Sequence, residues 1–287
     1  MGMARTVLTL AAIAWCALAQ EEGGPMPQQP KEAGLQASGP EAQADGTLLY
    51  RLRSPYQRGE TLLRVVLPRK PDPPETRRVL FVLPVEAGTG TRWGDGLAAA
   101  MKLDAANRHG FVLVAPTFSD WPWFCDHPTD PARRQESHLL KGVVPLVERL
   151  YPHAARRRAL LGFSKSGWGA FSLLLRNPEA FGAAAAWDAP MMAAKPAFEM
   201  GRICGTQETF ERYQISRLLR EHADAVRGSK RLGLFGYGNF RKDTQAAHAL
   251  MAELGIPHDY ADGPRRAHRW DSGWMEEALK ALREIMP

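Results

Sequence analysis

Residues 160–170 read LLGFSKSGWGA, an apolar run that passes through small residues into a helical pattern. This order predicts a buried strand over residues 158–163 and a helix over residues 166–176. Gly162 allows a sharp turn between the two, because glycine has no side chain to collide with neighbouring backbone. Ser164 stands within this turn. We therefore expect its hydroxyl to lie exposed at the end of the strand, where the N-terminus of the helix favours negative charge.

Strands and helices alternate on both sides of this stretch. We predict strands at residues 48–52, 61–67, 79–85, 111–115, 158–163, 182–187, 231–238 and 258–261, and helices at 94–108, 131–150, 166–176, 244–254 and 272–285. Repeated strand–helix units predict an α/β fold, with a mostly parallel sheet and helices on both faces. Residues 189–227 are a helical insertion, which we expect to form a cap over the site. Catalytic groups in such a sheet lie beyond the carboxyl ends of its strands.

The N-terminal segment has the pattern of a secretory signal peptide. Arg5 precedes an apolar run over residues 7–18, and Ala17-Leu18-Ala19 fits a cleavage site. The run is shorter than the ~20 residues that a membrane span needs. We therefore expect residues 1–19 to be removed and the mature protein to be secreted or periplasmic, without a stable membrane span.

The Pro-, Gly- and Gln-rich residues 20–46 are expected to form a disordered linker, which leaves residues 47–287 as one α/β domain. Cys125 and Cys204 remain after the signal peptide is removed. An oxidising compartment permits a disulfide between them, but the sequence does not show whether they are close together.

Composition excludes several other classes of protein. The chain of 287 residues is 45% hydrophobic and 24% charged, which is ordinary for a globular protein. Its formal charge of +6 comes from scattered basic residues and two short runs, at residues 156–158 and 265–266. No zinc-finger spacing or aromatic-rich RNA motif accompanies them, so a solvated surface is favoured over a nucleic-acid partner.

A serine hydroxyl is a weak nucleophile and needs a base, which in turn needs a carboxylate to orient it. His268 lies in a Gly- and Pro-containing loop before the last predicted helix and is the candidate base. Asp243 follows the predicted strand at residues 231–238 and is the candidate acid. Asp188, directly after the preceding strand, is the main competitor for that role.

Gly162–Phe171, GFSKSGWGAF, resembles the G-x-S-x-G-G-x-G-A stretch of the esterase D-type branch of the α/β-hydrolases. Ser166 departs from that pattern, because relatives have glycine there. His268-Arg269-Trp270 resembles the His-x-Trp base loop of the same branch, which includes S-formylglutathione hydrolases, feruloyl and acetyl-xylan esterases and mycolyltransferases. The resemblance implies the α/β-hydrolase fold and serine-dependent hydrolysis of carboxylic esters, without a cofactor.

An enzyme of this kind needs two backbone N–H groups that stabilise the oxyanion. The residue after the nucleophile, Lys165, should supply one of them. The loop after the predicted strand at residues 79–85 should supply the other. Pro84 has no N–H, so the second donor is Val85 or Glu86, and the sequence does not decide between them.

Aromatic residues are expected to line the substrate pocket. The loop at residues 121–127 follows a strand and should reach the site. Trp123, Trp168, Trp187 and Trp270 lie at strand or helix ends near it, although such tryptophans can equally be core residues. Aromatic walls suit a small-molecule or polysaccharide-linked ester substrate. Asp126 and His127 alone are too few to hold a metal, so none is expected.

Two alternative functions remain open. The same Ser, Asp and His could serve a peptidase or an acyltransferase. The chain could also be an inactive carbohydrate-binding relative, although the presence of all three residues argues against that.

Overall fold

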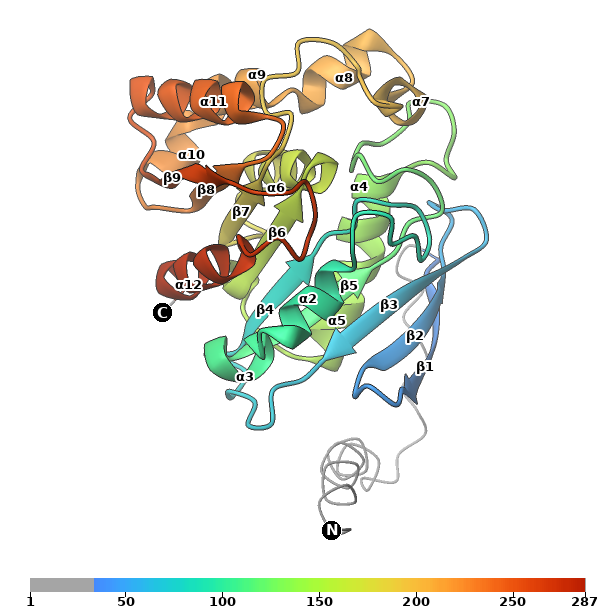
Figure 1. Cartoon of the computed structure of the whole chain (residues 1–287). Coiled ribbons are helices and arrows are strands. Elements are labelled where there is room, and N and C mark those ends of the chain that lie inside the picture. Colours follow the sequence, from blue (N-terminus) through green and yellow to red (C-terminus); the bar gives the residue numbers. More distant parts are fainter. Residues whose placement is uncertain (1–33, 287) are drawn as a thin grey trace.

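The computed structural model describes residues 34–286 (Figure 1). Their nine strands form one sheet. The strand order is β1-β2-β3-β5-β4-β6-β7-β8-β9. The strands are β1 (Gln36–Ala42), β2 (Leu48–Arg53), β3 (Glu60–Val66), β4 (Arg78–Val82), β5 (Phe111–Pro116), β6 (Arg158–Phe163), β7 (Ala183–Trp187), β8 (Leu232–Tyr237) and β9 (His258–Arg265). The predicted signal peptide lies outside the described residues.

The sheet is mixed in direction. Strands β1, β2 and β3 pair antiparallel, and β3 joins β5 in the same way. All pairings from β5 through β4, β6, β7 and β8 to β9 are parallel. The carboxyl ends of β4, β6, β7 and β8 therefore meet at one edge, which is where a ligand is expected in such a sheet.

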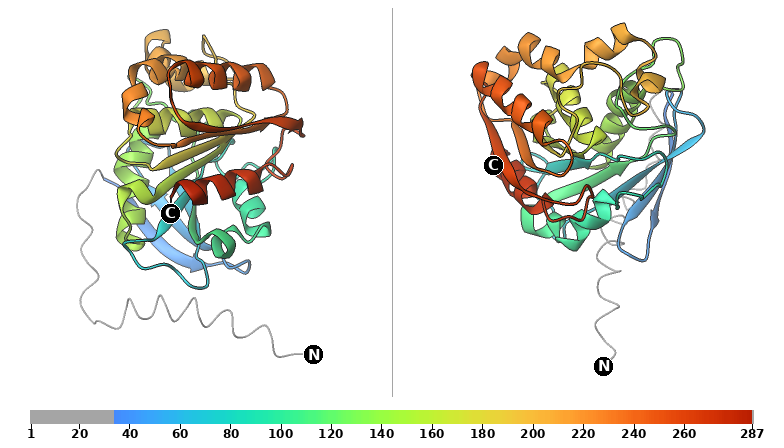
Figure 2. Two further views of the ribbon diagram at one scale, coloured as in Figure 1. Left: turned by 90° about the vertical axis from the view of Figure 1, so that its left-hand side faces the viewer. Right: turned by 45° about the horizontal axis from the view of Figure 1, so that its top comes forward.

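Helices cover both faces of the sheet, as Figure 2 shows from two further directions. One face carries α2 (Gly96–Lys102), α3 (Ala105–His109) and α12 (Met275–Ile285). The other face carries α4 (Gln135–His138), a π-helical turn η1 (Leu139–Val143), α5 (Val144–Leu150), α6 (Lys165–Arg176) and α11 (Arg241–Glu253).

The central strands are apolar throughout because both of their faces are buried. In β4, Val79 and Phe81 belong to the core on the α6 side, while Leu80 and Val82 belong to the core on the α12 side. The side chains alternate because successive residues of a strand point to opposite faces. The α/β fold with a mostly parallel sheet, predicted from these apolar runs, is confirmed.

Several predicted boundaries differ from the structure. The predicted linker is wrong for residues 36–42, which form β1 on the edge of the sheet. This strand is exposed and held by its backbone pairing with β2, so it lacks the apolar pattern of a buried strand. The predicted helix at 94–108 is divided at Asp104, whose φ is 51°. The predicted helix at 131–150 begins only at Gln135.

The insertion between β7 and β8 carries four short helices, α7 (Met200–Cys204), α8 (Gln207–Tyr213), α9 (Ile215–Glu221) and α10 (Ala223–Arg227). Helices α7, α8 and α9 lie along the top of the molecule in Figure 1, with α9 packed against α6 and α11. Among residues 34–286, no helix is long and apolar enough to cross a membrane.

A disulfide and a shared carboxylate are among the links that join the insertion to the body of the domain. Cys125, in the loop after β5, forms a disulfide with Cys204 of α7, and their Cα atoms are 5.6 Å apart. The hydroxyl of Tyr213 donates to Glu136 of α4 at 2.8 Å, and Arg176 of α6 forms two hydrogen bonds of 3.1 Å with the same carboxylate. The insertion is therefore fixed to the helices that flank the sheet.

We predict that the disulfide contributes to stability. It closes a separation of 79 residues, and cross-links of this kind stabilise domains by about 2–4 kcal/mol, chiefly by restricting the unfolded chain. Urea unfolding with and without reductant should show a loss of that size. The double variant Cys125→Ala/Cys204→Ala should be insensitive to reductant. Equal stability of the oxidised and reduced protein would contradict the prediction.

Candidate active site

Ser164 occupies the tight turn between β6 and α6. Its backbone has φ 54° and ψ −126°, a conformation that non-glycine residues rarely adopt. The turn brings the backbone of β6 against the first turn of α6, because a Cβ added to Gly162 would lie 2.1 Å from the carbonyl oxygen of Ser166. Only glycine fits at position 162, and the resulting turn presents the Ser164 side chain at the end of β6.

Ser166 points away from this end of the strand. Its side chain is fully buried, and its Oγ donates to the Phe163 carbonyl at 2.9 Å and lies 3.0 Å from the Phe163 N–H. The hydroxyl thereby binds the backbone of the residue just before Ser164. This contact explains how a serine is accommodated at a position where the esterase D-type pattern has glycine.

His268 joins Ser164 to a buried aspartate. Its Nε2 lies 3.1 Å from Ser164 Oγ, and its Nδ1 lies 2.5 Å from Oδ2 of Asp188. The Asp188 carboxylate also accepts hydrogen bonds from the backbone N–H groups of Asn239 and Phe240, at 2.7 to 2.9 Å. An ionised Asp188 fixes the Nδ1–H tautomer of His268, which leaves Nε2 free to accept the serine proton.

Asp188 remains ionised although its side chain is fully buried. Burial alone would raise the pKa of its carboxyl group. The hydrogen bonds from His268 and from the backbone N–H groups of the loop after β8 outweigh burial and hold that pKa below its usual range. Gly238 is required beside it, because a Cβ there would lie 2.5 Å from Asp188 Oδ2.

The prediction that Asp243 orients His268 is wrong. Asp243 lies in the first turn of α11, and its Oδ1 accepts a hydrogen bond of 2.9 Å from the backbone N–H of Met192. It therefore holds the start of the insertion. Asp188, the competing candidate, directly follows β7, which pairs with β6, and it contacts His268. The signal in the sequence was an aspartate directly after a buried strand, in the same relation as Ser164 to β6.

Aromatic rings surround the His268 imidazole, and sequence reasoning missed three of them. Their centroids lie at 4.4 Å for Phe163, 5.3 Å for Trp93, 5.8 Å for Phe240 and 6.2 Å for Trp187. These rings come from four separate segments of the chain. Together they restrict the imidazole to the orientation that contacts both Ser164 and Asp188.

The backbone near Ser164 offers the expected N–H donors. The Leu161 carbonyl accepts from the Leu83 N–H at 3.0 Å, which holds the end of β4 next to β6 and brings the following loop beside Ser164. Within residues 34–286, the N–H groups of Lys165, Val85 and Glu86 have no hydrogen-bond acceptor. They remain available to an oxyanion, and the structure does not single out Val85 or Glu86.

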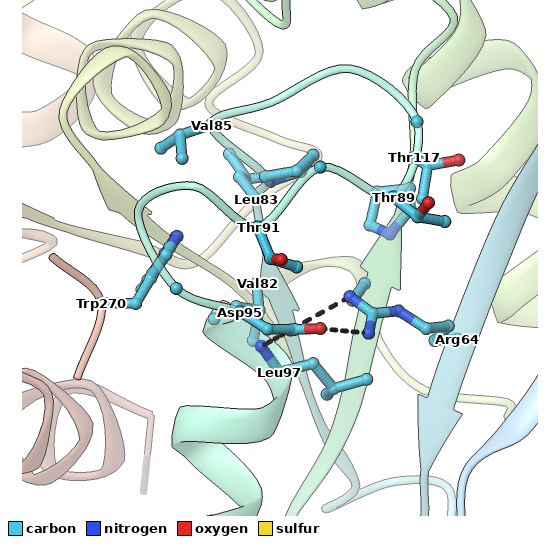
Figure 3. A pocket seen from close by; sticks show the side chains of 17 residues that line it. Arg64, Val82, Leu83, Val85, Thr89, Thr91, Asp95, Leu97, Thr117 and Trp270 are labelled. Carbon is cyan, nitrogen blue, oxygen red and sulfur yellow. Dashed lines mark hydrogen bonds and ion pairs between the residues drawn. The ribbon is translucent and has the colours of Figure 1, made fainter.

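A cavity of about 60 Å³ lies beside this loop (Figure 3). The loop at residues 82–97, the end of β5 and Trp270 form its walls. Arg64 lines the cavity and binds Asp95 through two hydrogen bonds of 2.5 and 3.1 Å, while Asp95 caps α2 through the N–H of Leu97 (Figure 3). This ion pair anchors the end of the loop that carries Val85 and Glu86.

Of the four tryptophans predicted to line the substrate pocket, two are core residues. Trp168 and Trp187 have no exposed surface and belong to the two cores, with Trp187 stacked on Trp274 at 5.5 Å. The prediction that these two line a substrate pocket is therefore wrong. Trp123 is also buried but lies beneath the Lys165 ammonium, and Trp270 lines the cavity of Figure 3. In the described part of the chain, no three metal-ligating side chains cluster.

We predict that the proton between His268 Nδ1 and Asp188 resonates far downfield in the proton NMR spectrum, since it lies in a short, charge-assisted hydrogen bond. Asp188→Asn should abolish this signal and Asp243→Asn should retain it. Loss of the signal in the Asp243 variant alone would contradict the assignment of the acid.

Comparison with known proteins agrees with the fold. Residues 119–225 match a family model described as a putative esterase, whereas no curated protein matches the sequence. Among solved structures, the S-formylglutathione hydrolase of Agrobacterium tumefaciens aligns with a TM-score of 0.67 at 17% identity, over 84% of this chain and 95% of its own. A ferulic acid esterase gives 0.65 at 18% identity, over 90% and 99%.

The fluorophosphonate-binding serine hydrolase F of Staphylococcus aureus gives a TM-score of 0.64 at 16% identity, over 84% of this chain and 98% of its own. Structural matches at identities this low establish the fold. The reaction has to be inferred from the residues of this chain. The chain has the α/β-hydrolase fold and resembles the esterase D-type branch of that superfamily.

Proposed function

We propose that this protein is a serine hydrolase that cleaves carboxylic esters through Ser164, His268 and Asp188. The observation that carries the proposal is the continuous hydrogen-bonded chain from Ser164 Oγ through His268 to a buried, ionised Asp188. The esterase family match over residues 119–225 and the hydrolase structures that share the fold support the same reaction class.

The geometry suits an acyl-enzyme mechanism. His268 Nε2 takes the proton of Ser164 as Oγ attacks the ester carbonyl, and Asp188 stabilises the imidazolium that forms. The N–H of Lys165, together with that of Val85 or Glu86, stabilises the negative charge on the carbonyl oxygen. His268 then gives its proton to the leaving alcohol. Water, activated by the same histidine, releases the acid and restores Ser164.

The activity should depend on these three side chains and not on Asp243. With a small chromogenic ester, Ser164→Ala and His268→Ala should lower kcat by roughly 10⁴–10⁶-fold. Asp188→Asn should lower it by about 10³–10⁴-fold, because the amide no longer fixes the histidine tautomer. The matched variant Asp243→Asn should lose less than about threefold, since it only weakens a contact to the Met192 backbone.

Labelling with a fluorophosphonate probe tests the nucleophile separately. Tandem mass spectrometry should place the label on Ser164, and His268→Ala should abolish it. Label on Ser166, or full activity in Ser164→Ala, would refute the proposed mechanism. Cleavage of amides in preference to esters, or acyl transfer in preference to hydrolysis, would reassign the reaction while keeping the three residues.

We also propose that the protein is exported after removal of residues 1–19. The supporting observation inside the domain is the Cys125–Cys204 disulfide, since such bonds persist in oxidising compartments and are rare in the cytosol. Sequencing of the mature protein isolated from outside the cytoplasm should find Gln20 at its N-terminus. An uncleaved chain confined to the cytoplasm would refute export.

A further inference from the structure

Two backbone hydrogen bonds hold the loop that carries His268, one on either side of this residue. The loop covers residues 266–274 between β9 and α12 and is called the base loop here. The N–H two residues before His268 donates to the carbonyl of Tyr237, the last residue of β8, at 2.9 Å. Two residues after His268, the Trp270 N–H donates to the Trp93 carbonyl at 2.9 Å. The sheet thus fixes one side of His268, and Trp93 fixes the other.

Trp93 also contacts the imidazole through its side chain. The centroid of its half-buried ring lies 5.3 Å from that of His268, and the two planes meet at 82°. This edge-to-face arrangement is one that aromatic rings favour. The Arg92 guanidinium lies 4.9 Å from the centroid of the same indole, a distance at which a cation attracts the ring. The indole therefore packs against the imidazole while Arg92 stabilises the indole itself.

Trp93 differs from the core rings around His268 in the segment that carries it. Phe163 and Trp187 end strands β6 and β7 and have no exposed surface, so the sheet fixes them. Trp93 lies in the loop between β4 and α2, residues 83–95, which is called the oxyanion loop here because it carries both candidates for the second oxyanion donor. A displacement of this loop would therefore also displace the contact with the imidazole.

The chain directly after Trp93 lies close to the base loop. Gly94 has φ 87°, and a Cβ added to it would lie 3.4 Å from Trp270 Cβ. A Cβ added to Gly96 would lie 2.9 Å from the Trp270 ring. Asp95, between the two glycines, is anchored to β3 by the ion pair shown in Figure 3. This packing holds the Trp93 carbonyl where the Trp270 N–H reaches it.

We propose that Trp93 is a positioning residue that couples the base loop to the oxyanion loop. Its ring and its carbonyl together keep His268 Nε2 directed at Ser164. This inference rests on the proposed ester hydrolysis and adds a residue that does not touch the reacting atoms. The coupling matters for the rate, because misplacing a reacting group by about 1 Å can lower the rate by about 10²-fold.

Removal of the indole tests the side chain. With a small chromogenic ester, Trp93→Ala should lower kcat by about 10–100-fold and leave KM within about threefold. The rate constant for labelling of Ser164 by fluorophosphonate should fall by the same factor, because labelling needs the same base and no bound ester. The downfield proton between His268 and Asp188 should broaden. Trp93→Phe keeps an aromatic ring and should return both rates to within about fivefold of the wild type.

Tyr56→Ala is the matched control for the ring. Tyr56 is also half-buried with a cation near its ring, since Lys141 Nζ lies 5.9 Å from the ring centroid. It lies between β2 and β3, which are separated from β8 and β9 by four strands of the sheet. Its substitution should leave kcat, the labelling rate and the downfield proton unchanged.

Gly94→Ala tests the backbone contact separately. An alanine at φ 87° is strained, and its Cβ would meet Trp270, so the Trp93 carbonyl should shift and kcat should fall by about tenfold. Gly46→Ala is the matched control, because Gly46 has φ 88° and no atom within 4 Å of an added Cβ. It introduces the same backbone strain far from His268 in the sequence and should retain the wild-type kcat.

All rates are referred to the concentration of active sites, which prolonged labelling with fluorophosphonate titrates, so misfolded protein does not contribute. Labelling of Trp93→Ala at the wild-type rate, with only KM raised, would mean that Trp93 binds substrate and does not position the base. Equal losses of kcat in Trp93→Ala and Tyr56→Ala would reduce the effect to general destabilisation and also overturn the proposal. Failure of the ester hydrolysis itself would appear differently, as the absence of Ser164 labelling in the wild type.

Discussion

The contact between Gly162 and the backbone of Ser166 is the constraint on which the rest of the site depends. It forces the chain to reverse within two residues of β6, and it accounts for the left-handed conformation of Ser164. The strained backbone of Ser164 is stabilised by the packing of β6, which is buried throughout, and of α6, which is buried over residues 166–175.

The other two members of the site are positioned by different means. Asp188 is held by backbone N–H groups at the end of the adjacent strand β8, so its position follows from the sheet. His268 lies in a loop, where no backbone ladder fixes it, and aromatic rings from several segments restrict it instead. The loop that carries His268 therefore meets the end of β7, which carries Asp188, at the imidazole ring.

Most of the fold and two of the three site residues could be predicted from the sequence. The apolar runs at β4, β5 and β6 mark strands buried on both faces. Ser164 directly follows one of them, and His268 stands in the loop between the last strand and the last helix. Asp243 and Asp188 both follow strands, and only the spatial order of β6, β7 and β8 separates them. That order is long-range information, which local patterns do not carry. Strand β1 was missed because backbone pairing, without apolar burial, holds it in the sheet.

The hydrogen bonds of Asp188 have a consequence for how this architecture can diversify. They tie the residue that precedes the insertion to the backbone that follows β8, so both boundaries of residues 189–227 are set by the sheet itself. A change in the length of the segment between them would therefore leave the Asp188 carboxylate at the His268 imidazole, because neither end of that contact lies within the segment.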